Sequence, residues 1–150
     1  MNTKYFEKIR IFDGGMGQEL LSKGLISKGT LWSASALIEK EFHKLVIDAH
    51  ISYINAGADI IVTNNFSARK IRFIQNKVLD KFQYANEQAG ILANKAREIS
   101  KQNILIAGSL PSQNDTYVED ERSSSEIQSD FEEQAKIISP YIDFFYLDVV

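Results

Sequence analysis

The chain has 150 residues and a formal net charge of −3 at pH 7, with 44% hydrophobic residues, 25% charged residues and no cysteine. These are ordinary values for a globular domain, and the missing cysteine excludes a disulfide framework. The slightly acidic balance gives no indication of nucleic-acid binding, and no apolar stretch is long enough to span a membrane. Because the polar start, Met1 to Lys4, also lacks the apolar core of a signal peptide, we expect a cytoplasmic protein.

Short apolar segments alternate with longer amphipathic helical patterns along the chain. Strands are predicted at residues 9–12, 59–63, 103–107 and 143–147, which are rich in aliphatic or aromatic residues as buried parallel strands are. Helices are predicted around residues 45–54, with Gly57 just beyond, 82–99, and 125–139, with an N-cap at Ser123, Ser124 or Ser125. This alternation predicts an α/β fold of parallel βαβ units with right-handed crossovers.

An acid followed by three glycines stands where the first predicted strand gives way to a helix. A strand that ends at Phe12 would deliver the Asp13 carboxylate to its carboxyl end. Gly14, Gly15 and Gly17 would leave backbone N–H groups free to approach an anion. The set could therefore hold the amine and the carboxylate of an amino acid. The alternative is that this segment is only a tight turn.

Four segments of the chain carry motifs in a characteristic order: residues 13–20, 31–34, 55–66 and 107–111, the last followed by Tyr117. They resemble the D-G-x-x-G-T-E-L, L-W-S-A, x-A-G-A-D-x-x-x-T-N-T-[FY] and G-S-L-P-P…S-Y motifs of the homocysteine S-methyltransferase family. That family includes betaine–homocysteine methyltransferase and the homocysteine module of cobalamin-dependent methionine synthase. Gln18 departs from the pattern, because threonine is usual there. The order and spacing of the four motifs make the resemblance specific.

The resemblance implies a (βα)8 TIM barrel that transfers a methyl group to the thiolate of homocysteine and so forms methionine. The donor would be a small molecule such as S-methylmethionine, S-adenosylmethionine or betaine. Family members bind Zn²⁺ through cysteine thiolates, and the zinc ion binds the homocysteine thiol and lowers its pKa, so that a thiolate attacks the donor. Because this chain has no cysteine, we expect zinc in the full-length family enzyme and none in this chain alone. No catalytic residue and no metal ligand are assigned, and His43 and His50 are interpreted as partly exposed helix residues.

The length of the chain suits only part of such a barrel, which takes about 250 residues. We predict that residues 1–150 are the N-terminal part of a single homocysteine-binding barrel domain, with about three βα units and a fourth strand. This chain alone is then expected to be inactive. The alternative is a non-catalytic half-barrel that acts as an interaction or pseudoenzyme subunit. An unpaired fourth strand leads us to expect self-association or a partner that completes the barrel.

Five residues are predicted to bind homocysteine, because barrel enzymes build their sites from the loops after the strands: Asp13, Gly14, Thr63, Asn64 and Asp148. The short polar side chains of Thr63 and Asn64 suit a carboxylate, although they could instead cap the next helix. Asp148 stands where the family has a glutamate that helps to hold the amino group of homocysteine. The alternative for Asp148 is an acid at a strand end that points into solvent.

Two aromatic residues, Trp32 and Tyr117, are predicted on the side of the methyl donor. The resemblance implies that Trp32 lies near the mouth of the active site, where it could contact a cationic donor through a cation–π interaction. The alternative is that Trp32 packs under a loop. Tyr117 belongs to a long polar segment, residues 112–125, which we interpret as a flap. Arg69 and Lys70 are expected on a solvated helix face.

Overall fold

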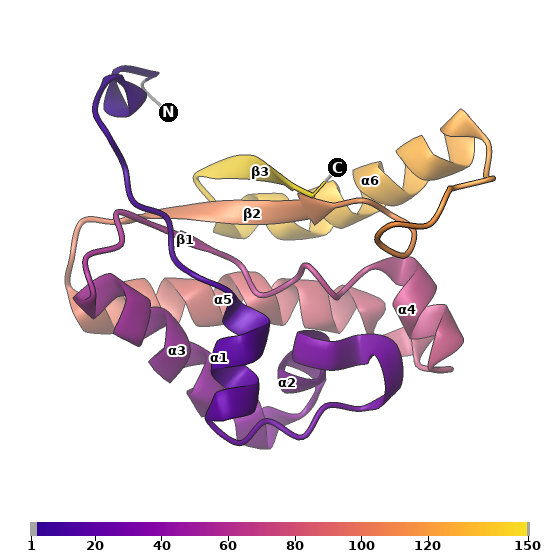
Figure 1. Cartoon of the computed structure of the whole chain (residues 1–150), viewed down its shortest axis with the longest axis horizontal. Coiled ribbons are helices and arrows are strands. Elements are labelled where there is room, and N and C mark those ends of the chain that lie inside the picture. The colour runs from indigo at the N-terminus through magenta and orange to yellow at the C-terminus, as the bar shows by residue number, and fades with distance from the viewer. Residues whose placement is uncertain (1–2, 150) are drawn as a thin grey trace.

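The computed structural model describes residues 3–149, and at its centre lies a parallel sheet of three strands in the order β1-β2-β3 (Figure 1). The strands are β1 (Ile60–Val62), β2 (Leu105–Pro111) and β3 (Phe144–Asp148). The central strand β2 is parallel to both neighbours, with Ile106 opposite Ile61 of β1. The α/β fold predicted from the alternating pattern is therefore confirmed. Residues 1, 2 and 150, at the ends of the predicted domain, lie outside the described part of the chain.

Helices precede and connect the strands. The α-helices are α1 (Met16–Ser22), α2 (Ser35–Ile38), α3 (His43–Asn55), α4 (Lys70–Gln75), α5 (Phe82–Ser100) and α6 (Ser124–Ile138). Short 3-10 helices lie at Thr3–Glu7, Gly29–Ala34, Lys40–Phe42, Leu79–Lys81 and Ser139–Tyr141. Across residues 3–149, none of these helices is both long and apolar enough to cross a membrane.

Buried apolar side chains join the sheet to its helices. Helices α3, α5 and α6 pack against the strands, and α1 and α2 lie farther from them (Figure 1). One buried cluster joins α3, α5, β1 and β2: Ile54, Ile61, Ala93, Ala96, Ile104 and Ile106. A larger cluster joins the helices to one another and includes Leu20, Leu37, Val46, Phe73 and Leu92. Close packing of this kind fixes the strands, and with them the strand ends that carry the site residues.

The helix ends follow local sequence signals. Ser123, one of three candidate N-caps, begins α6 through a capping box. Its Oγ accepts a hydrogen bond from the Glu126 backbone N–H at 3.3 Å, and the Glu126 carboxylate accepts one from the Ser123 backbone N–H at 2.9 Å. Gly57 follows α3 with a φ of +103°, a conformation that favours glycine. The helices predicted at residues 82–99 and 125–139 are confirmed as α5 and α6.

The first predicted strand, residues 9–12, is wrong: this segment forms only an isolated parallel bridge between Phe12 and Ile60. The Ile11 backbone N–H donates to Asp59 Oδ2 at 2.9 Å, so a side chain takes the place of a strand carbonyl. Ile9 is 93% exposed because no second strand within residues 3–149 covers this segment. The bridge at Phe12 nevertheless holds the next residue beside β1.

The third predicted strand, residues 103–107, starts and ends too early, since β2 runs from Leu105 to Pro111. The predicted strand end leaves Gly108 and Ser109 outside the strand, and this boundary is wrong. Both residues pair with β3, which extends β2 beyond the three residues that pair with β1. A Cβ at Gly108 would lie 2.5 Å from Ile142 Cδ1, so glycine allows the chain before β3 to approach β2.

The last strand, β3, is an edge within the described chain, where it pairs only with β2. It matches the strand predicted at residues 143–147 to within one residue, but it is not buried on both faces. Exposed apolar side chains lie along it: Phe145, Tyr146 and Leu147, followed by Val149. An apolar strand with one free edge is a template for pairing with another chain.

We expect this edge to make the purified chain associate, so that light scattering after size exclusion gives a mass above that of a monomer. Leu147→Lys should shift the distribution towards the monomer, because a charge on an edge strand opposes pairing. Ile26→Lys is the matched control, since Ile26 is 73% exposed but lies outside the sheet. A monodisperse wild-type monomer with a sharp cooperative melt would contradict this prediction.

Candidate active site

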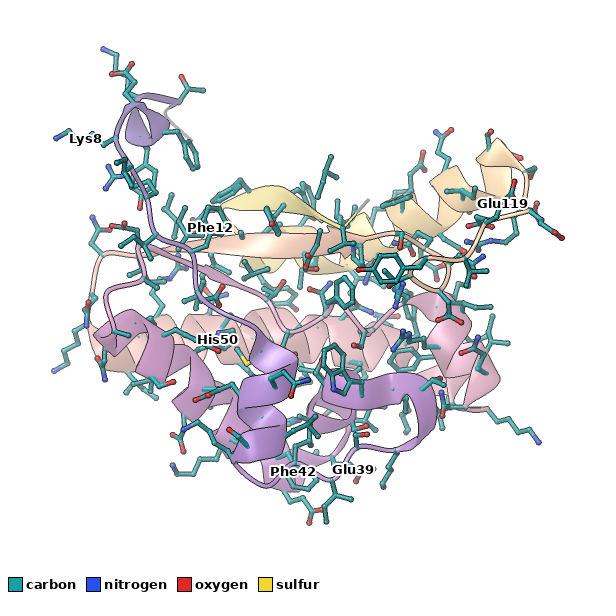
Figure 2. The ribbon with its side chains drawn as sticks, in the orientation of Figure 1. Lys8, Phe12, Glu39, Phe42, His50 and Glu119 are labelled. Atoms are coloured by element: carbon teal, nitrogen blue, oxygen red, sulfur yellow. The ribbon has the colours of Figure 1, made fainter. Side chains whose placement is uncertain are left out.

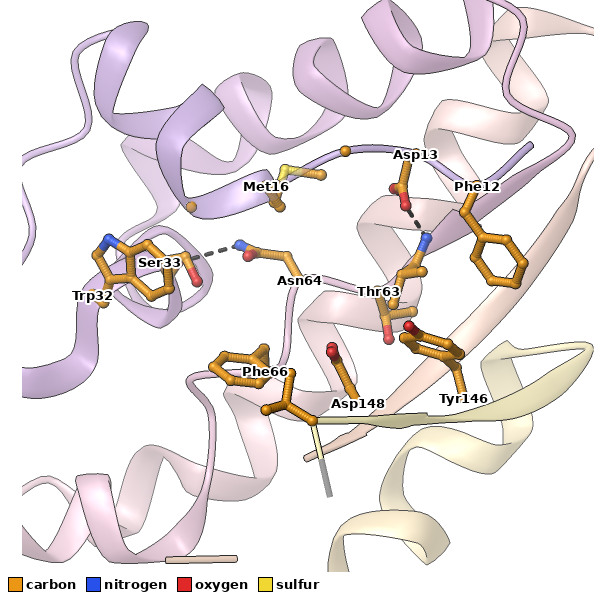
Figure 3. Close-up of a pocket in the computed structure, with 15 residues that line it drawn as sticks. Phe12, Asp13, Met16, Trp32, Ser33, Thr63, Asn64, Phe66, Tyr146 and Asp148 are labelled. Carbon is orange, nitrogen blue, oxygen red and sulfur yellow. Dashed lines mark hydrogen bonds between the residues drawn. The ribbon is translucent and has the colours of Figure 1, made fainter. Parts of the chain in front are cut away.

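A cavity of about 330 Å³ opens at the carboxyl ends of the strands (Figure 3). It is lined by residues 12–17, by Trp32 and Ser33, by residues 62–64 with Phe66, and by Tyr146, Asp148 and Val149. Asp13 and Asp148 point into it from opposite sides (Figure 3). The cavity is the size of a small-molecule site, apolar over much of its wall and with few polar groups.

Asp13 is held beside the end of β1 by backbone and side-chain contacts. Its backbone N–H donates to Ile60 O at 2.9 Å, and its Oδ2 accepts the Val62 N–H at 3.0 Å. The side chain is only 3% exposed. Burial raises the pKa of the Asp13 carboxyl to about 7; the Asp148 carboxylate adds to this rise, and the Val62 N–H opposes it. Asp13 can therefore change its charge near neutral pH.

The glycines after Asp13 make room for aromatic rings. A Cβ at Gly14 would lie 2.9 Å from Tyr53 Cε1, and a Cβ at Gly17 would lie 2.4 Å from Trp32 Cζ2. Trp32 itself has a φ of 46°, which is unusual for a residue with a side chain and marks a strained position. The indole thus packs on α1 and also lines the cavity. Trp32 therefore has a packing role and also a place in the wall of the site.

Thr63 and Asn64, which follow β1, are both buried and both line the cavity. The Thr63 hydroxyl donates to Asn65 Oδ1 at 2.6 Å and accepts the Ser109 N–H at 3.1 Å. The Asn64 amide donates to Ser33 O at 3.2 Å. Neither residue caps a helix, because the N-cap of α4 is Arg69. The helix-capping alternative is therefore wrong, and both side chains fix the shape of this wall.

Asp148 ends β3 and does not point into solvent. Ser109 Oγ donates to Asp148 Oδ2 at 2.9 Å, so the neighbouring strand orients this carboxylate. Tyr146 lines the same cavity, and the sequence analysis missed it. The signal was present, because residues two apart on a strand point to the same face. Phe66 was also missed, and no spacing rule identifies it.

Tyr117 does not reach this cavity. It is 98% exposed, with a φ of 67°, and it borders a different cavity between residues 112–118 and α6. The structure therefore does not bring Tyr117 together with Trp32 on one wall.

Two basic side chains expected near the surface are buried. Arg69 has no exposed area; its Nη1 donates to Ser112 O at 3.3 Å and also to the carbonyl of Asn114. These loop carbonyls take the place of water, so the expectation of a solvated face is wrong for Arg69. His50 is also completely buried, whereas His43 is half-buried and contacts Leu37 O at 3.0 Å. The prediction of partial exposure is wrong for His50.

Comparison with known proteins places this site in a family. A family model described as homocysteine S-methyltransferase matches residues 10–150. The chain belongs to this family. The match covers every segment that lines the cavity, so the two carboxylates and the glycine turn lie in its homocysteine S-methyltransferase region.

Relatives and solved structures agree with the homocysteine S-methyltransferase family. The chain is 32% identical to homocysteine S-methyltransferase of Escherichia coli (strain K12) over 115 residues, which are 69% of this chain and 35% of that protein. It is 36% identical to homocysteine S-methyltransferase 1 of Zea mays over 64 residues, which are 43% of this chain and 19% of the relative. The metallated form of the homocysteine methyltransferase MmuM from Escherichia coli superposes with a TM-score of 0.80 at 25% identity. That match covers 98% of this chain and 56% of the solved chain, so this chain spans about half of MmuM.

The residues of this family member do not fit a resident zinc ion. Among residues 3–149, no three His, Cys, Asp or Glu side chains lie close enough together to hold a metal. The chain contains no cysteine, and thiolates are among the ligands that zinc prefers. The cavity offers only the two carboxylates of Asp13 and Asp148.

Proposed function

We propose that this chain forms the amino-acid-binding part of a homocysteine S-methyltransferase. The thiolate sulfur of homocysteine attacks the methyl carbon of a small donor, the bond between that carbon and the donor heteroatom breaks, and the donor leaves with the electron pair. The product is methionine. S-Methylmethionine, S-adenosylmethionine and betaine all present a methyl group on a cationic heteroatom and suit this chemistry.

The observation that carries the proposal is that two carboxylates face one cavity: the buried Asp13 side chain from the segment beside β1, and the half-buried Asp148 side chain from the end of β3. An ammonium group placed between them would receive charge-assisted hydrogen bonds. The backbone at Gly14 and Gly15 borders the same space and can approach the substrate carboxylate, because neither residue has a side chain of its own. The Asn64 and Thr63 wall completes this end of the substrate site.

The aromatic side of the cavity suits the reacting end of the substrates. Trp32 and Phe66 line the wall near Asn64, and Phe12 and Tyr146 lie towards the Asp13 end (Figure 3). Aromatic faces attract sulfonium and quaternary ammonium groups and exclude water from the attacking thiolate. We assign Trp32 to the donor side and do not retain Tyr117 there, because it borders the other cavity.

We further propose that residues 1–150 are one part of a (βα)8 barrel domain whose remaining strands lie outside this sequence or on another chain. The superposition on 56% of the MmuM chain and the free edge of β3 support this. The metal ligands of the complete enzyme would come from that remaining part. This chain would supply the substrate anchor and not the metal.

The test is zinc content and homocysteine methylation, first with the purified, tag-free chain and then with the rest of the barrel supplied as a second polypeptide. We expect no stoichiometric zinc and no methyl transfer from any of the three donors with the chain alone, because no thiolate is present. Both should appear when the barrel is completed. Tight one-to-one zinc binding by the chain alone would contradict the proposal that the metal ligands lie in the remaining part of the barrel. A completed barrel that does not methylate homocysteine would contradict the proposed function.

A further inference from the structure

A buried histidine stands directly behind the carboxylate of the proposed substrate anchor. His50, on α3, lies below Phe12 in Figure 2, and Phe12 directly precedes Asp13 in the chain. Its Nδ1 is 3.9 Å from Asp13 Oδ2, and the two side chains are 0% and 3% exposed. That distance is too long for a hydrogen bond, and an approach of about 1 Å would make one. Neither ring nitrogen of His50 has a hydrogen-bond partner within residues 3–149.

Few other charged groups face this pair. Asp148 approaches Asp13 from β3, and Tyr53 lies on the next turn of α3. Glu19 of α1 is already engaged by Ser52 Oγ at 3.3 Å and Lys23 at 3.2 Å. The buried residues of α2 and α5, which pack near α3, include no titratable side chain. Asp13 is therefore the one carboxylate described within 4 Å of the His50 ring.

The two oxygens of Asp13 have different surroundings. Oδ2 accepts the Val62 N–H at 3.0 Å and is the oxygen nearest His50. Because Oδ2 is engaged by the Val62 N–H and faces His50, we infer that Oδ1 is the oxygen left for a ligand in the cavity. Burial raises the pKa of Asp13 to about 7 and lowers that of His50 to about 4. Near pH 7 the imidazole is therefore neutral, and Asp13 is divided between its acid and its ionised form.

We propose that His50 is a positioning residue for Asp13: its neutral ring donates an Nδ1–H hydrogen bond to the ionised carboxylate and so sets the pH range in which the pocket accepts an ammonium group. His50 lies next to Asp13 Oδ2, the oxygen that already accepts the Val62 N–H. Neither ring nitrogen of His50 has a hydrogen-bond partner among the described residues. This inference rests on the proposed function in one respect, that the ligand of Asp13 is the ammonium group of an amino acid.

The sign of the pH dependence follows from Asp13. An ammonium group binds the ionised carboxylate, so affinity rises as pH increases through the Asp13 pKa near 7. A hydrogen bond to the ionised form lowers that pKa, and removing the donor raises it. If His50→Leu raises the Asp13 pKa by about one unit, the ionised fraction at the wild-type midpoint falls from about one half to about one eleventh, which weakens binding roughly fivefold at that pH. At pH 9 both proteins are ionised, and the ratio of affinities returns to about one.

The experiment that needs no substrate is carbon-13 NMR of the Asp13 carboxyl as a function of pH. We expect its midpoint to rise by about one unit in His50→Leu and to stay near the wild-type value in His50→Gln, whose amide can donate. His43→Leu is the matched control, because it makes the same change on the same helix without facing Asp13. A His50→Leu midpoint within about 0.3 unit of the wild type would overturn the proposal and leave His50 as a core filler.

Two further measurements test the role of His50, one of them without any variant. If His50→Leu does not fold, nitrogen-15 NMR of the wild-type ring at pH 8.5 decides, since a proton on Nδ1 is expected and a bare Nδ1 would overturn the proposal. Calorimetry with reduced L-homocysteine should then give a ratio of mutant to wild-type Kd that falls from pH 6 to pH 9. A loss of affinity that is equal at every pH would indicate a structural role. If neither the chain nor the completed barrel binds homocysteine at any pH, the proposed function is wrong, while the NMR titration still decides the role of His50.

Discussion

Asp13→Asn is expected to weaken homocysteine binding roughly ten- to a hundredfold at pH 8. A charge-assisted hydrogen bond, worth about 1.5–3 kcal/mol, becomes a neutral one, and about 1.4 kcal/mol corresponds to a tenfold change in affinity. The Asn side chain can still accept the Val62 N–H, so the fold should survive. The loss should be smaller at pH 6, because wild-type Asp13, whose pKa is raised to about 7, is then mostly protonated and already neutral.

Calorimetry measures this effect on the form of the protein that binds homocysteine, either the chain alone or the chain completed by the remaining strands. Asp48→Asn is the matched control, because it removes the same charge from an exposed position of α3 that pairs with Lys44. The assignment of Asp13 to the substrate would be wrong if Asp13→Asn kept its affinity and instead lowered the melting temperature. Asp13 would then be a structural cap for the Gly14–Gly15 turn.

Gly90→Ala should destabilise the protein by about 2 kcal/mol, although Gly→Ala in an open helix interior stabilises by up to about 1 kcal/mol. The reason is position: a Cβ at Gly90 of α5 would lie 2.3 Å from the Cβ of Tyr141. That atom belongs to the start of the side chain and cannot rotate away. Asn94 Nδ2 also donates to Tyr141 O at 2.7 Å, so separating the two segments breaks a hydrogen bond. The melting temperature should fall by roughly 4–8 °C.

Two controls separate this clash from a general cost of substitution. Gly15→Ala, where no atom lies within 4 Å of the added Cβ, should change stability by less than about 1 kcal/mol. In a double-mutant cycle, Tyr141→Gly should cancel much of the cost of Gly90→Ala, because it removes the clashing atom. If Gly90→Ala stabilised the protein on its own, the close approach of α5 and Tyr141 would be wrong.

The sequence located the three longest helices, α3, α5 and α6, because their signals are local. Helical spacing of apolar residues predicted α5, and the serines at 123–125 predicted the start of α6 without deciding which of them is the N-cap. Strand ends depend on neighbours instead. Gly108 and Ser109 are in β2 because they pair with β3, and residues 9–12 are not a strand because they form only one bridge, between Phe12 and Ile60. No property of either segment alone distinguishes these outcomes.

The sequence by itself determined the α/β alternation, the order of the motifs and therefore the family, and it pointed to Asp13, Gly14, Thr63, Asn64, Trp32 and Asp148, all of which line one cavity. Thr63 and Asn64 follow β1, Asp148 ends β3 and Asp13 follows the bridge at Phe12, and the carboxyl ends of parallel strands meet at one edge of a sheet. Trp32 reaches the same edge from the 3-10 helix Gly29–Ala34. Tertiary structure alone decided that Tyr117 lies elsewhere, that Arg69 is buried and that His50 stands behind Asp13. Burial and the charge of a carboxylate depend on which distant segments pack around it, and a linear pattern does not contain that information.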